Sequence, residues 1–356
     1  MLIDKPPTYK TYMPKKRVTS QDVANLAGVS RTTVSFVLND VKGFNISPET
    51  RQKVREAAES LNYIPDATAQ ALASRRAKAI GLVMTRSPHH IATDTFLPQI
   101  IGGMMEVVKD NKLRLLIEYV EAEHQDRAYL ELARSKHIDG MILLTPRLDD
   151  AGLKKLEQVD VPTVLMGEIE GSNLYSVDVD NALASQKAVE YLLELGHTQI
   201  ACITNAPATY TAAPDRVRGY KNALTNAGIV PDDELVRYAD FTPESGYAEM
   251  RSLLTAGKKF TAVFVASDNV AMGVKAALRE AGMRIPEDIS LVGFDDIPWA
   301  QYADPPLTTV HLQAPELARR ACLVLMDLLK GNEPETKRQI IDTHLIVRKS
   351  CRALEN

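Results

Sequence analysis

The first part of the chain has two short stretches in which apolar residues recur at helical spacing. Between residues 18 and 39 these residues lie three and four positions apart, which predicts two helices joined by a turn. Thr19 can cap the first helix through its hydroxyl, with Asp22 as the reciprocal partner. Gly28 suits the left-handed backbone of a sharp turn, and Ser30 can cap the second helix. The residues predicted to face inward are Val23, Leu26 and Ala27 in the first helix and Val34, Val37 and Leu38 in the second.

A third helix is predicted to begin after Ser47, which can cap it, with Pro48 at its first position. Together the three helices would close a small domain over residues 17–64. The Ala-rich segment 65–77 that follows is helix-prone but too short to be stable by itself. It is interpreted either as a plain linker helix or as a helix that forms only against DNA. The inward-facing residues of the third helix would be Val54, Ala57, Ala58 and Leu61.

From residue 78 onward, apolar segments alternate with amphipathic helical ones, for instance at 97–111, 181–195 and 269–281. Near-continuous apolar strands separated by helices indicate parallel sheets covered on both faces. One sheet usually contains about five or six strands, and the number here is larger, so two lobes are expected. The predicted strands are residues 79–84, 114–119, 140–145, 162–166, 199–204, 261–266 and 289–294.

Charge is unevenly distributed, although the whole chain of 356 residues has a formal net charge of only −4. Residues 1–78 contain 13 Lys and Arg against 7 Asp and Glu, whereas the remainder contains 29 against 39. A basic head on an acidic body is expected when only the head meets a polyanion. Residues 1–16 are expected to be a disordered leader, which either touches DNA phosphates or is simply a flexible terminus.

Cysteine usage and hydropathy predict a cytoplasmic protein. The three cysteines, Cys202, Cys322 and Cys351, are far apart and form no CxxC pair, so neither a disulfide framework nor a zinc site is expected. No apolar run reaches the length of a membrane span, and the first residues lack the apolar core of a signal peptide. The adjacent His89 and His90 have no spaced third ligand and are expected to be solvated. No metal and no cofactor is expected.

Two helices joined by a glycine-containing turn, the second with polar residues at its exposed start, are what a helix-turn-helix DNA reader needs. The first turn of such a helix reaches base edges in the major groove. The residues expected to point outward are Arg31, Thr32, Ser35 and Phe36. The alternative is an ordinary helical hairpin inside a core, and the basic surroundings favour the DNA reader.

Several motifs in order resemble the lactose repressor and galactose repressor family of bacterial transcription regulators. They are VTSQDVANLAGVSRTTVSFVLN at 18–39, ALASRR before AIGLVM at 71–84, LELGHTQIACI at 193–203, RVRGYKNAL at 216–224, FVASDNVAMGVKAALREAGMRIPEDISLVGFDDI at 264–297 and PPLTTVHL at 305–312. The resemblance runs from about Arg17 to Cys351. It implies an α/β fold: a helix-turn-helix three-helix head, a hinge helix at 65–77 and a two-lobed, periplasmic-binding-protein-like sensor over 78–356, with a parallel sheet in each lobe.

The resemblance also implies how the sensor is divided. The N-terminal lobe would hold about 78–180 and 311–343, and the C-terminal lobe about 181–310 and 344–356. The chain would cross between the lobes near Asp180, Val310 and Thr343, and a small effector would lie between them.

For the head, the resemblance implies that outward residues early in the second helix read bases. Arg31 would donate to guanine O6 and N7, or else contact only phosphate. Phe36 stands where a polar residue is often found, so only an apolar base contact is expected there. Leu72 matches the family's intercalating hinge leucine, or else it packs on its own domain. The whole DNA-contacting set is Thr19, Ser30, Arg31, Thr32, Thr33, Ser35, Phe36, Asn39 and Leu72, of which Ser30, Thr33 and Ser35 are expected to touch phosphates.

For the sensor, Arg216 and Asp295 match positions that commonly hydrogen-bond the ligand, with a purely structural ion pair as the alternative. Phe241 matches a position where an aromatic ring stacks on the ligand, or else it packs in the core. The polar and mostly uncharged segment 205–216 suits a carbohydrate better than a phosphate ester or a dicarboxylate. The remaining effector candidates are Ser267 and Asp268 after a predicted strand, and Asp94 and Phe96 from the other lobe.

The predicted function is a ligand-responsive repressor that binds a pseudo-palindromic operator in double-stranded DNA as a homodimer. A carbohydrate effector is favoured over a nucleobase, a nucleoside or another non-sugar molecule. A solute-binding protein is the alternative from another class, and the basic helical head argues against it. No enzyme activity is expected, because the sequence has no GxSxG, Walker A or strand-linked GxGxxG motif. No membrane partner is expected.

Overall fold

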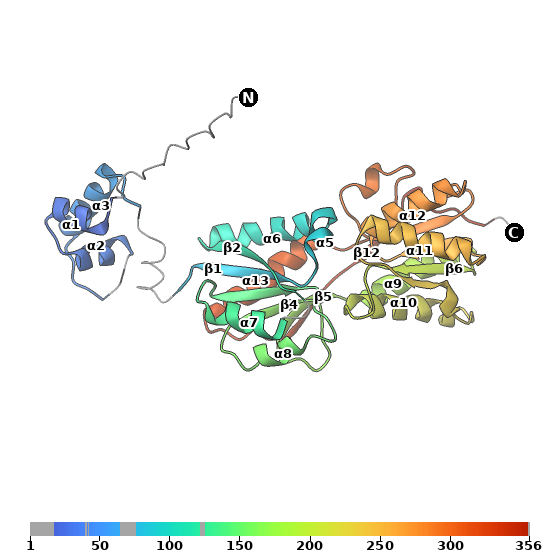
Figure 1. Ribbon diagram of the computed structural model, residues 1–356, viewed down its shortest axis with the longest axis horizontal. Coiled ribbons are helices and arrows are strands. Elements are labelled where there is room, and N and C mark those ends of the chain that lie inside the picture. The colour runs from blue at the N-terminus through green and yellow to red at the C-terminus, as the bar shows by residue number, and fades with distance from the viewer. Residues whose placement is uncertain (1–17, 40, 42, 65–75, 122–124, 355–356) are drawn as a thin grey trace, which may run out of the picture. The chain divides into compact units, whose positions relative to one another are not determined.

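The computed structural model describes residues 18–39, 41, 43–64, 76–121 and 125–354 (Figure 1). They belong to two compact units that divide after Arg76, and each unit is described by itself. The predicted leader 1–16 and the hinge leucine Leu72 lie outside the described residues, as does nearly all of the segment 65–77. Within the described part of the chain, no helix is long and apolar enough to cross a membrane.

The head consists of α1 (Ser20–Ala27), α2 (Arg31–Leu38) and α3 (Pro48–Ser60). Thr19 and Asp22 form the expected reciprocal capping box, and Gly28 ends α1 with φ of 67°. The Ser30 hydroxyl accepts a hydrogen bond from the Thr33 amide at the start of α2, as expected. The capping residues therefore predicted where both short helices begin and where α1 ends.

The predicted inner face of α1 was wrong at one position. Leu26 is 58% exposed, and Ala24 is buried in its place. The side chains that meet α2 and α3 lie on the Val23, Ala24 and Ala27 side of the helix. Helical spacing alone is compatible with an inner face that includes either Leu26 or Ala24 beside Val23. The helices packed against α1 determine which of the two is buried.

The N-terminal lobe is a six-stranded sheet in which every pairing is parallel, with the order β11-β5-β4-β3-β1-β2. Helices α6 and α13 pack against each other on one face, and α7 and α8 pack together (Figure 1). Strands and helices in chain order are β1 (Ala79–Met84), α5 (Pro88–Thr93), α6 (Leu97–Asp110), β2 (Arg114–Tyr119), α7 (Gln125–Arg134), β3 (Gly140–Leu144), α8 (Ala151–Leu156), β4 (Thr163–Met166), β5 (Tyr175–Val179), α13 (Ala314–Leu329) and β11 (Arg338–Ile341).

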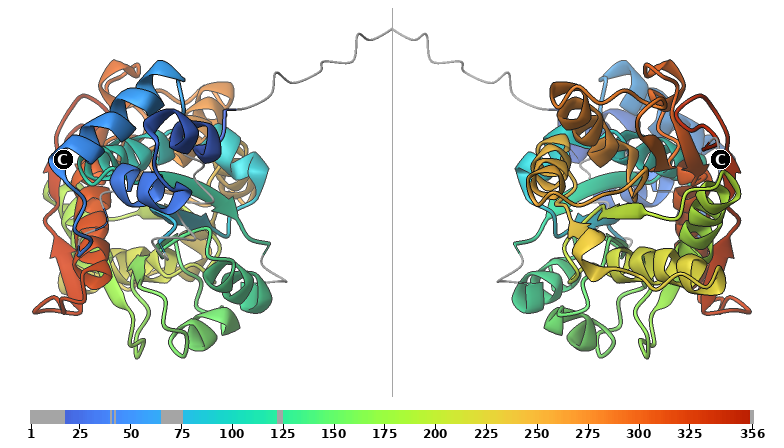
Figure 2. Two further views of the ribbon diagram at one scale, coloured as in Figure 1. Left: turned by 90° about the vertical axis from the view of Figure 1, so that its left-hand side faces the viewer. Right: turned by 90° about the vertical axis from the view of Figure 1, so that its right-hand side faces the viewer.

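The C-terminal lobe repeats this design with the order β12-β10-β9-β8-β6-β7. Its pairings are parallel except that of the edge strand β12, which is antiparallel to β10. The right panel of Figure 2 separates the yellow-green helices α9 and α10 from the orange α12 across the sheet. In chain order the elements are α9 (Asn181–Glu194), β6 (Ile200–Thr204), α10 (Ala212–Asn226), the 3₁₀ turn η2 (Asp233–Leu235), β7 (Val236–Tyr238), α11 (Pro243–Thr255), β8 (Ala262–Val265), α12 (Asp268–Glu280), β9 (Ser290–Asp295), η3 (Ala300–Tyr302), β10 (Thr308–His311) and β12 (His344–Ile346).

The chain passes between the two sheets three times. The passages lie between Val179 and Asn181, between His311 and Ala314, and between Ile341 and His344. Each lobe is therefore assembled from separate stretches of sequence, and the lobes are joined by three short connections.

The α/β fold class with a parallel sheet in each lobe is confirmed. All seven predicted strands are present, and β1 and β2 have the predicted bounds. The five that were not predicted are β5, β7, β10, β11 and β12. They are short or contain polar residues, as in YSVDV of β5 and RQII of β11, so they lack the continuous apolar run that is typical of buried parallel strands.

Candidate functional site

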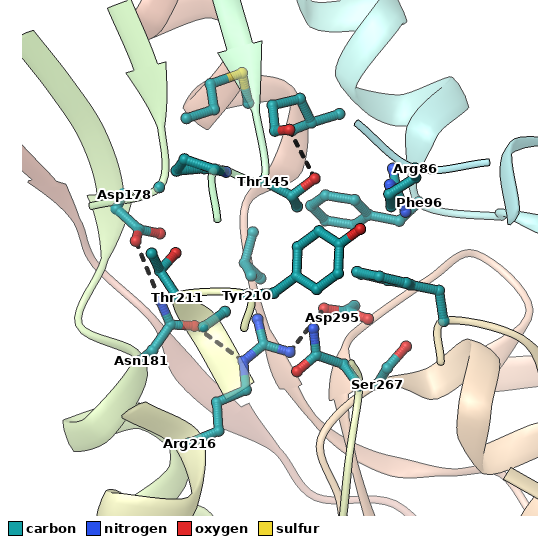
Figure 3. Close-up of a pocket in the computed structure, with 18 of the residues that line it drawn as sticks. Arg86, Phe96, Thr145, Asp178, Asn181, Tyr210, Thr211, Arg216, Ser267 and Asp295 are labelled. Atoms are coloured by element: carbon teal, nitrogen blue, oxygen red, sulfur yellow. Dashed lines mark hydrogen bonds and ion pairs between the residues drawn. The ribbon is translucent and has the colours of Figure 1, made fainter. Parts of the chain in front are cut away.

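A cavity lies between the two lobes and is lined by residues that follow strands of both sheets (Figure 3). Its volume is about 90 Å³, and one water molecule needs roughly 10–15 Å³ of such space, so a small polar molecule has room in it. From the N-terminal lobe come Arg86, Asp94, Phe96, Thr145 and Asp178, and from the C-terminal lobe Asn181, Asn205, Tyr210, Thr211, Arg216, Phe241, Ser267, Asn269 and Asp295.

Three of the lining residues have a backbone conformation that side chains rarely adopt. The angle φ is 53° at Thr145, 61° at Phe241 and 113° at Asp295. A β-branched or aromatic residue pays a steric cost in this region, and such residues concentrate at functional sites because the surrounding fold holds them there. The strain marks the cavity as more than a packing gap.

Arg216 of α10 extends along the floor of the cavity. Its Nε donates to Oδ1 of Asn181 at 2.9 Å, one Nη donates to the carbonyl of Ala266, and its guanidinium carbon lies 3.8 Å from the centre of the Phe294 ring. Nη1 lies 3.9 Å from Oδ1 of Asp295. Asp295 ends β9, so both members of this pair belong to the C-terminal lobe.

Burial shifts the protonation of the acidic groups around Arg216. It raises the pKa of Asp295 to about 6, against the opposing effect of the Arg216 guanidinium. Burial likewise raises the pKa of Asp178 to about 7, although that carboxylate accepts hydrogen bonds from the Val179 amide and the Asn181 side chain. Near neutral pH these two carboxyl groups can therefore either accept or donate hydrogen bonds.

Phe241 lies at the centre of a group of rings and cations drawn from both lobes. The Tyr210 ring meets it edge-on at 4.9 Å between centroids. The guanidinium carbon of Arg86, from the other lobe, lies 4.9 Å from its centroid, and the His90 ring lies at 5.6 Å. Phe241 is buried and lines the cavity, so packing and contact with a ligand are compatible roles for it.

Arg86 follows β1 and is only 4% exposed. Its Nη1 donates to the Asp94 carboxylate, and Asp94 in turn accepts hydrogen bonds from the amides of Phe96 and Leu97 at 2.7 and 3.0 Å. These contacts tie the loop after β1 to the start of α6. They bring a buried ion pair to the wall of the cavity.

Direct contacts between the lobes hold them together at the rim of the cavity. The Leu148 amide donates to the Thr209 carbonyl at 2.7 Å, and Nε2 of His90 lies 3.1 Å from Oδ2 of Asp240. Thr95 donates a hydrogen bond to Asn269 at 3.4 Å, the Thr211 amide donates to the Pro146 carbonyl at 3.4 Å, and the Arg147 guanidinium carbon lies 5.2 Å from the centre of the Tyr210 ring. The sensor is therefore in a closed arrangement.

Six of the seven effector candidates named from sequence line the cavity; they are Asp94, Phe96, Arg216, Phe241, Ser267 and Asp295. Asp268 does not. Its carboxylate is fully buried, accepts hydrogen bonds from the Thr309 hydroxyl and the Ile297 amide, and is packed against the space left by Gly293. Asp268 thus links α12 to β10 instead of facing a ligand.

The sequence reasoning missed Arg86, Thr145, Asp178, Asn205 and Asn269, among other lining residues. A signal for most of them was available, because Arg86, Thr145 and Asn205 all come within two residues of the end of a strand. In parallel sheets ligands bind at the carboxyl ends of strands, so the positions of these three residues already mark them as candidates.

In the head, Arg31 and Thr32 are exposed at the start of α2. Phe36 is only partly exposed, because its ring stacks on Phe44 at 3.9 Å between centroids and 22° between planes. The polar candidates near the helix ends all make local contacts: Thr19 with Asp22, Ser30 with Thr33, and Ser35 with Asn39. Only Arg31 and Thr32 combine exposure with long or polar side chains at the first turn of α2.

No three His, Cys, Asp or Glu side chains of the described residues gather in a way that could hold a metal ion. His90, a superficial metal candidate, is engaged with Asp240.

A helix-turn-helix head followed by a two-lobed sensor, whose cavity is lined by charged, amide and aromatic side chains, defines a DNA-binding regulator that responds to a small molecule. The model of the bacterial regulatory proteins of the lacI family matches residues 19–66, and that of the periplasmic binding protein-like domain matches residues 189–351. The chain is 34% identical over 339 residues to the HTH-type transcriptional regulator CelR of Thermobifida fusca, covering 94% of this chain and 99% of that one.

Solved structures of transcription regulators are similar to this chain over nearly its whole length. The complex of the transcriptional regulator CelR with cellobiose shares 34% identity and a TM-score of 0.72, covering 94% of this chain and all of the other. The lac repressor dimer bound to operator and the anti-inducer ONPF shares 31% identity and a TM-score of 0.83, covering 95% of this chain and all of the other. The chain belongs to the lacI family of bacterial transcription regulators, and it is a DNA-binding regulator of transcription.

Proposed function

We propose that the protein is a repressor that binds a pseudo-palindromic operator as a homodimer and is controlled by a carbohydrate held between its lobes. The observation that carries the proposal is the lining of the cavity. It combines aromatic rings, amides, carboxyl groups and guanidinium groups, the mixture that binds a molecule with an apolar ring face and many hydroxyl groups.

Closure of the lobes supplies the link between ligand and DNA. A ligand that contacts residues of both lobes favours the closed arrangement by its difference in affinity for the closed and open states. In a dimer, that change alters the spacing of two DNA-reading heads and therefore the affinity for a two-fold operator. Two similar structures support this assignment. They are the complex of CelR with cellobiose and the lac repressor dimer bound to operator and an anti-inducer. Its site of action is then the cytoplasm, where the DNA is.

The test has two measurements on the full chain. Thermal unfolding is followed with a panel of neutral sugars, sugar acids, nucleobases and nucleosides, because a ligand at about 100 times its Kd stabilises the native state by about 2.7 kcal/mol. Footprinting on genomic DNA fragments then asks whether the protected site has two-fold symmetry and whether the same ligand changes protection.

A neutral sugar that raises the Tm and alters protection is the expected result. A nucleoside that does so in place of every sugar would overturn the carbohydrate assignment while leaving the regulator intact. The variant Arg31→Ala is the matched control, since it should weaken protection and leave the ligand-induced change in Tm unaltered.

A further inference from the structure

One edge of the Arg86 guanidinium has no hydrogen-bond partner among the described residues, although the side chain is buried. Nη1 is engaged by Asp94, whereas Nε and Nη2 are inaccessible to solvent and unpaired. A buried donor without an acceptor costs about 1–3 kcal/mol, so native structures rarely retain one outside a functional site. Arg86 lines the cavity (Figure 3), so a ligand that displaces the atoms covering this edge can supply the missing acceptors.

The unpaired edge is the one that binds pairs of oxygen atoms elsewhere in this protein. Among the described residues, three other arginines use Nε and Nη2 together to hold both oxygens of a carboxylate. They are Arg147 with Asp149 at 2.8 and 2.7 Å, Arg319 with Glu316 at 2.6 and 2.7 Å, and Arg284 with Asp288 at 3.0 and 3.3 Å. The spacing of these two N–H groups therefore suits two adjacent oxygen atoms.

The guanidinium is also held in place. Asp94 fixes one end of it and is itself fixed by two backbone amides, and the Phe241 ring lies 4.9 Å from the guanidinium carbon. Because Asp94 belongs to the same lobe and orients the side chain whether or not the lobes are closed, little conformational entropy is lost when the edge binds. Arg86 comes from the N-terminal lobe and Phe241 from the C-terminal lobe, so a molecule bound at this edge lies against both.

The charges of the cavity favour two neighbouring hydroxyl groups over a carboxylate as the pair of ligand oxygens at Arg86. Two guanidinium groups, Arg86 and Arg216, face three carboxyl groups, Asp94, Asp178 and Asp295. Asp94 already neutralises Arg86, and Asp295 already accompanies Arg216. A carboxylate on the ligand would add a further negative charge to a set with no spare cation, whereas two neighbouring hydroxyl groups would add none.

We propose that Arg86 determines ligand specificity by donating from Nε and Nη2 to two adjacent hydroxyl oxygens of an uncharged carbohydrate. This inference rests on the proposed carbohydrate effector and adds to it the residue that selects neutral sugars. The neighbouring hydroxyl groups of a sugar ring accept at Arg86, while their own protons remain free for other acceptors in the cavity.

The test is calorimetric titration of the full chain with D-glucose, D-galactose, D-xylose and cellobiose, and with glucuronate and galacturonate as acidic probes. The wild type should bind at least one neutral sugar more tightly than either acid. Arg86→Gln and Arg86→Lys should each weaken that sugar roughly 10- to 100-fold, since neither retains the two-nitrogen edge. The control Arg284→Gln removes the same kind of edge at an exposed site and should leave the affinity unchanged.

Monodeoxy derivatives of the bound sugar separate recognition from a structural effect. In the wild type, removal of either hydroxyl group that contacts Arg86 should weaken binding, and in Arg86→Gln the same removal should have little further effect. Tight binding of an acid in preference to every neutral sugar, or unchanged affinity in Arg86→Gln, would overturn the role of Arg86. If none of the six probes binds the wild type, the carbohydrate effector itself is wrong and the role of Arg86 falls with it.

Discussion

Arg216 and Asp295 form a buried pair, 3.9 Å apart between Nη1 and Oδ1, that joins α10 to the end of β9. The sequence left open whether this pair binds a ligand or only stabilises the lobe. The structure gives it contacts of both kinds, because Arg216 is also bound to Asn181 and to the Ala266 carbonyl while both members line the cavity. Loss of either side chain should therefore affect folding as well as binding.

Arg216→Ala should be strongly destabilising, because it leaves the Asp295 carboxylate buried without its cation. Removing one partner of a buried pair typically costs about 3–5 kcal/mol. Urea unfolding gives the loss in free energy. The control is Arg218→Ala on the same helix, whose pair with Asp215 is exposed and should contribute less than about 1 kcal/mol. Equal losses in the two variants would contradict the structural role of Arg216.

Two adjacent glycines in α6 should respond oppositely to replacement by alanine. A Cβ at Gly103 would lie 2.2 Å from the Pro315 carbonyl oxygen, so Gly103→Ala must separate α6 from α13. Gly102 is exposed and has nothing within 4 Å of the same position, so Gly102→Ala should stabilise the helix by about 0.5–1 kcal/mol. Thermal unfolding of the two variants measures both effects, and a stabilising Gly103→Ala would show that the helices are not in this contact.

The contribution of Asp178 to the stability of the sensor should fall as the pH rises from about 4 to about 8. The pKa of Asp178 is raised from 3.8 to about 7 by burial, so between these values the folded state binds more protons than the unfolded state. Its stabilising contribution is complete below pH 4 and is lost as the pH rises through 7. Asp178→Asn should reduce this loss by an amount on the order of a few kcal/mol.

Urea unfolding at pH 5 and pH 8 checks this prediction. Asp295, with a pKa of about 6, remains in the variant and contributes a smaller decline of the same sign. The same difference between the two pH values in wild type and Asp178→Asn would rule out Asp178 as its source.

Arg31→Ala distinguishes base reading from phosphate contact at the start of α2. If Arg31 reads a guanine, affinity for the operator should fall by about 1–3 kcal/mol, and most of that loss should vanish on an operator altered at that base pair. If Arg31 contacts only phosphate, the loss of affinity should be the same for all DNA sequences. The slope of the logarithm of the binding constant against the logarithm of the salt concentration should then decrease in magnitude by about one. Lys53→Ala, on α3 and paired with Glu49, serves as a control for loss of positive charge from the head.

The architecture was accessible from the sequence because it depends on local patterns. Apolar runs separated by amphipathic helices gave seven strands and two sheets, and the capping residues Thr19, Gly28 and Ser30 gave the helix ends of the head. Edge strands such as β7 and β12 were not predicted, because a strand of three residues is defined by its pairing with the neighbouring strand and not by its own composition.

The site was accessible only in part. Arg216, Asp295 and Phe241 were named from the resemblance to a family, and all three line the cavity. Asp268 was predicted to face the cleft, but a side chain that follows a strand can also point back into its own lobe. The side chain of Asp268 points into the lobe, where the absence of a Cβ at Gly293 leaves room for it. The position of Arg86 just after β1 marks it as a candidate, but its unpaired edge could not be predicted, because that edge depends on where Asp94 and Phe241 lie in three dimensions.

The three passages of the chain between the lobes impose an order on biosynthesis. The N-terminal lobe lacks an edge strand until β11 has been made, and the C-terminal lobe lacks one until β12 has been made. Among the described residues, the core of the head is formed by residues within 23–63, so the head can fold as soon as it leaves the ribosome. The sensor, in contrast, exposes open strand edges and apolar faces until almost the whole chain has emerged. During translation, therefore, the sensor and not the head is the part that needs protection from aggregation.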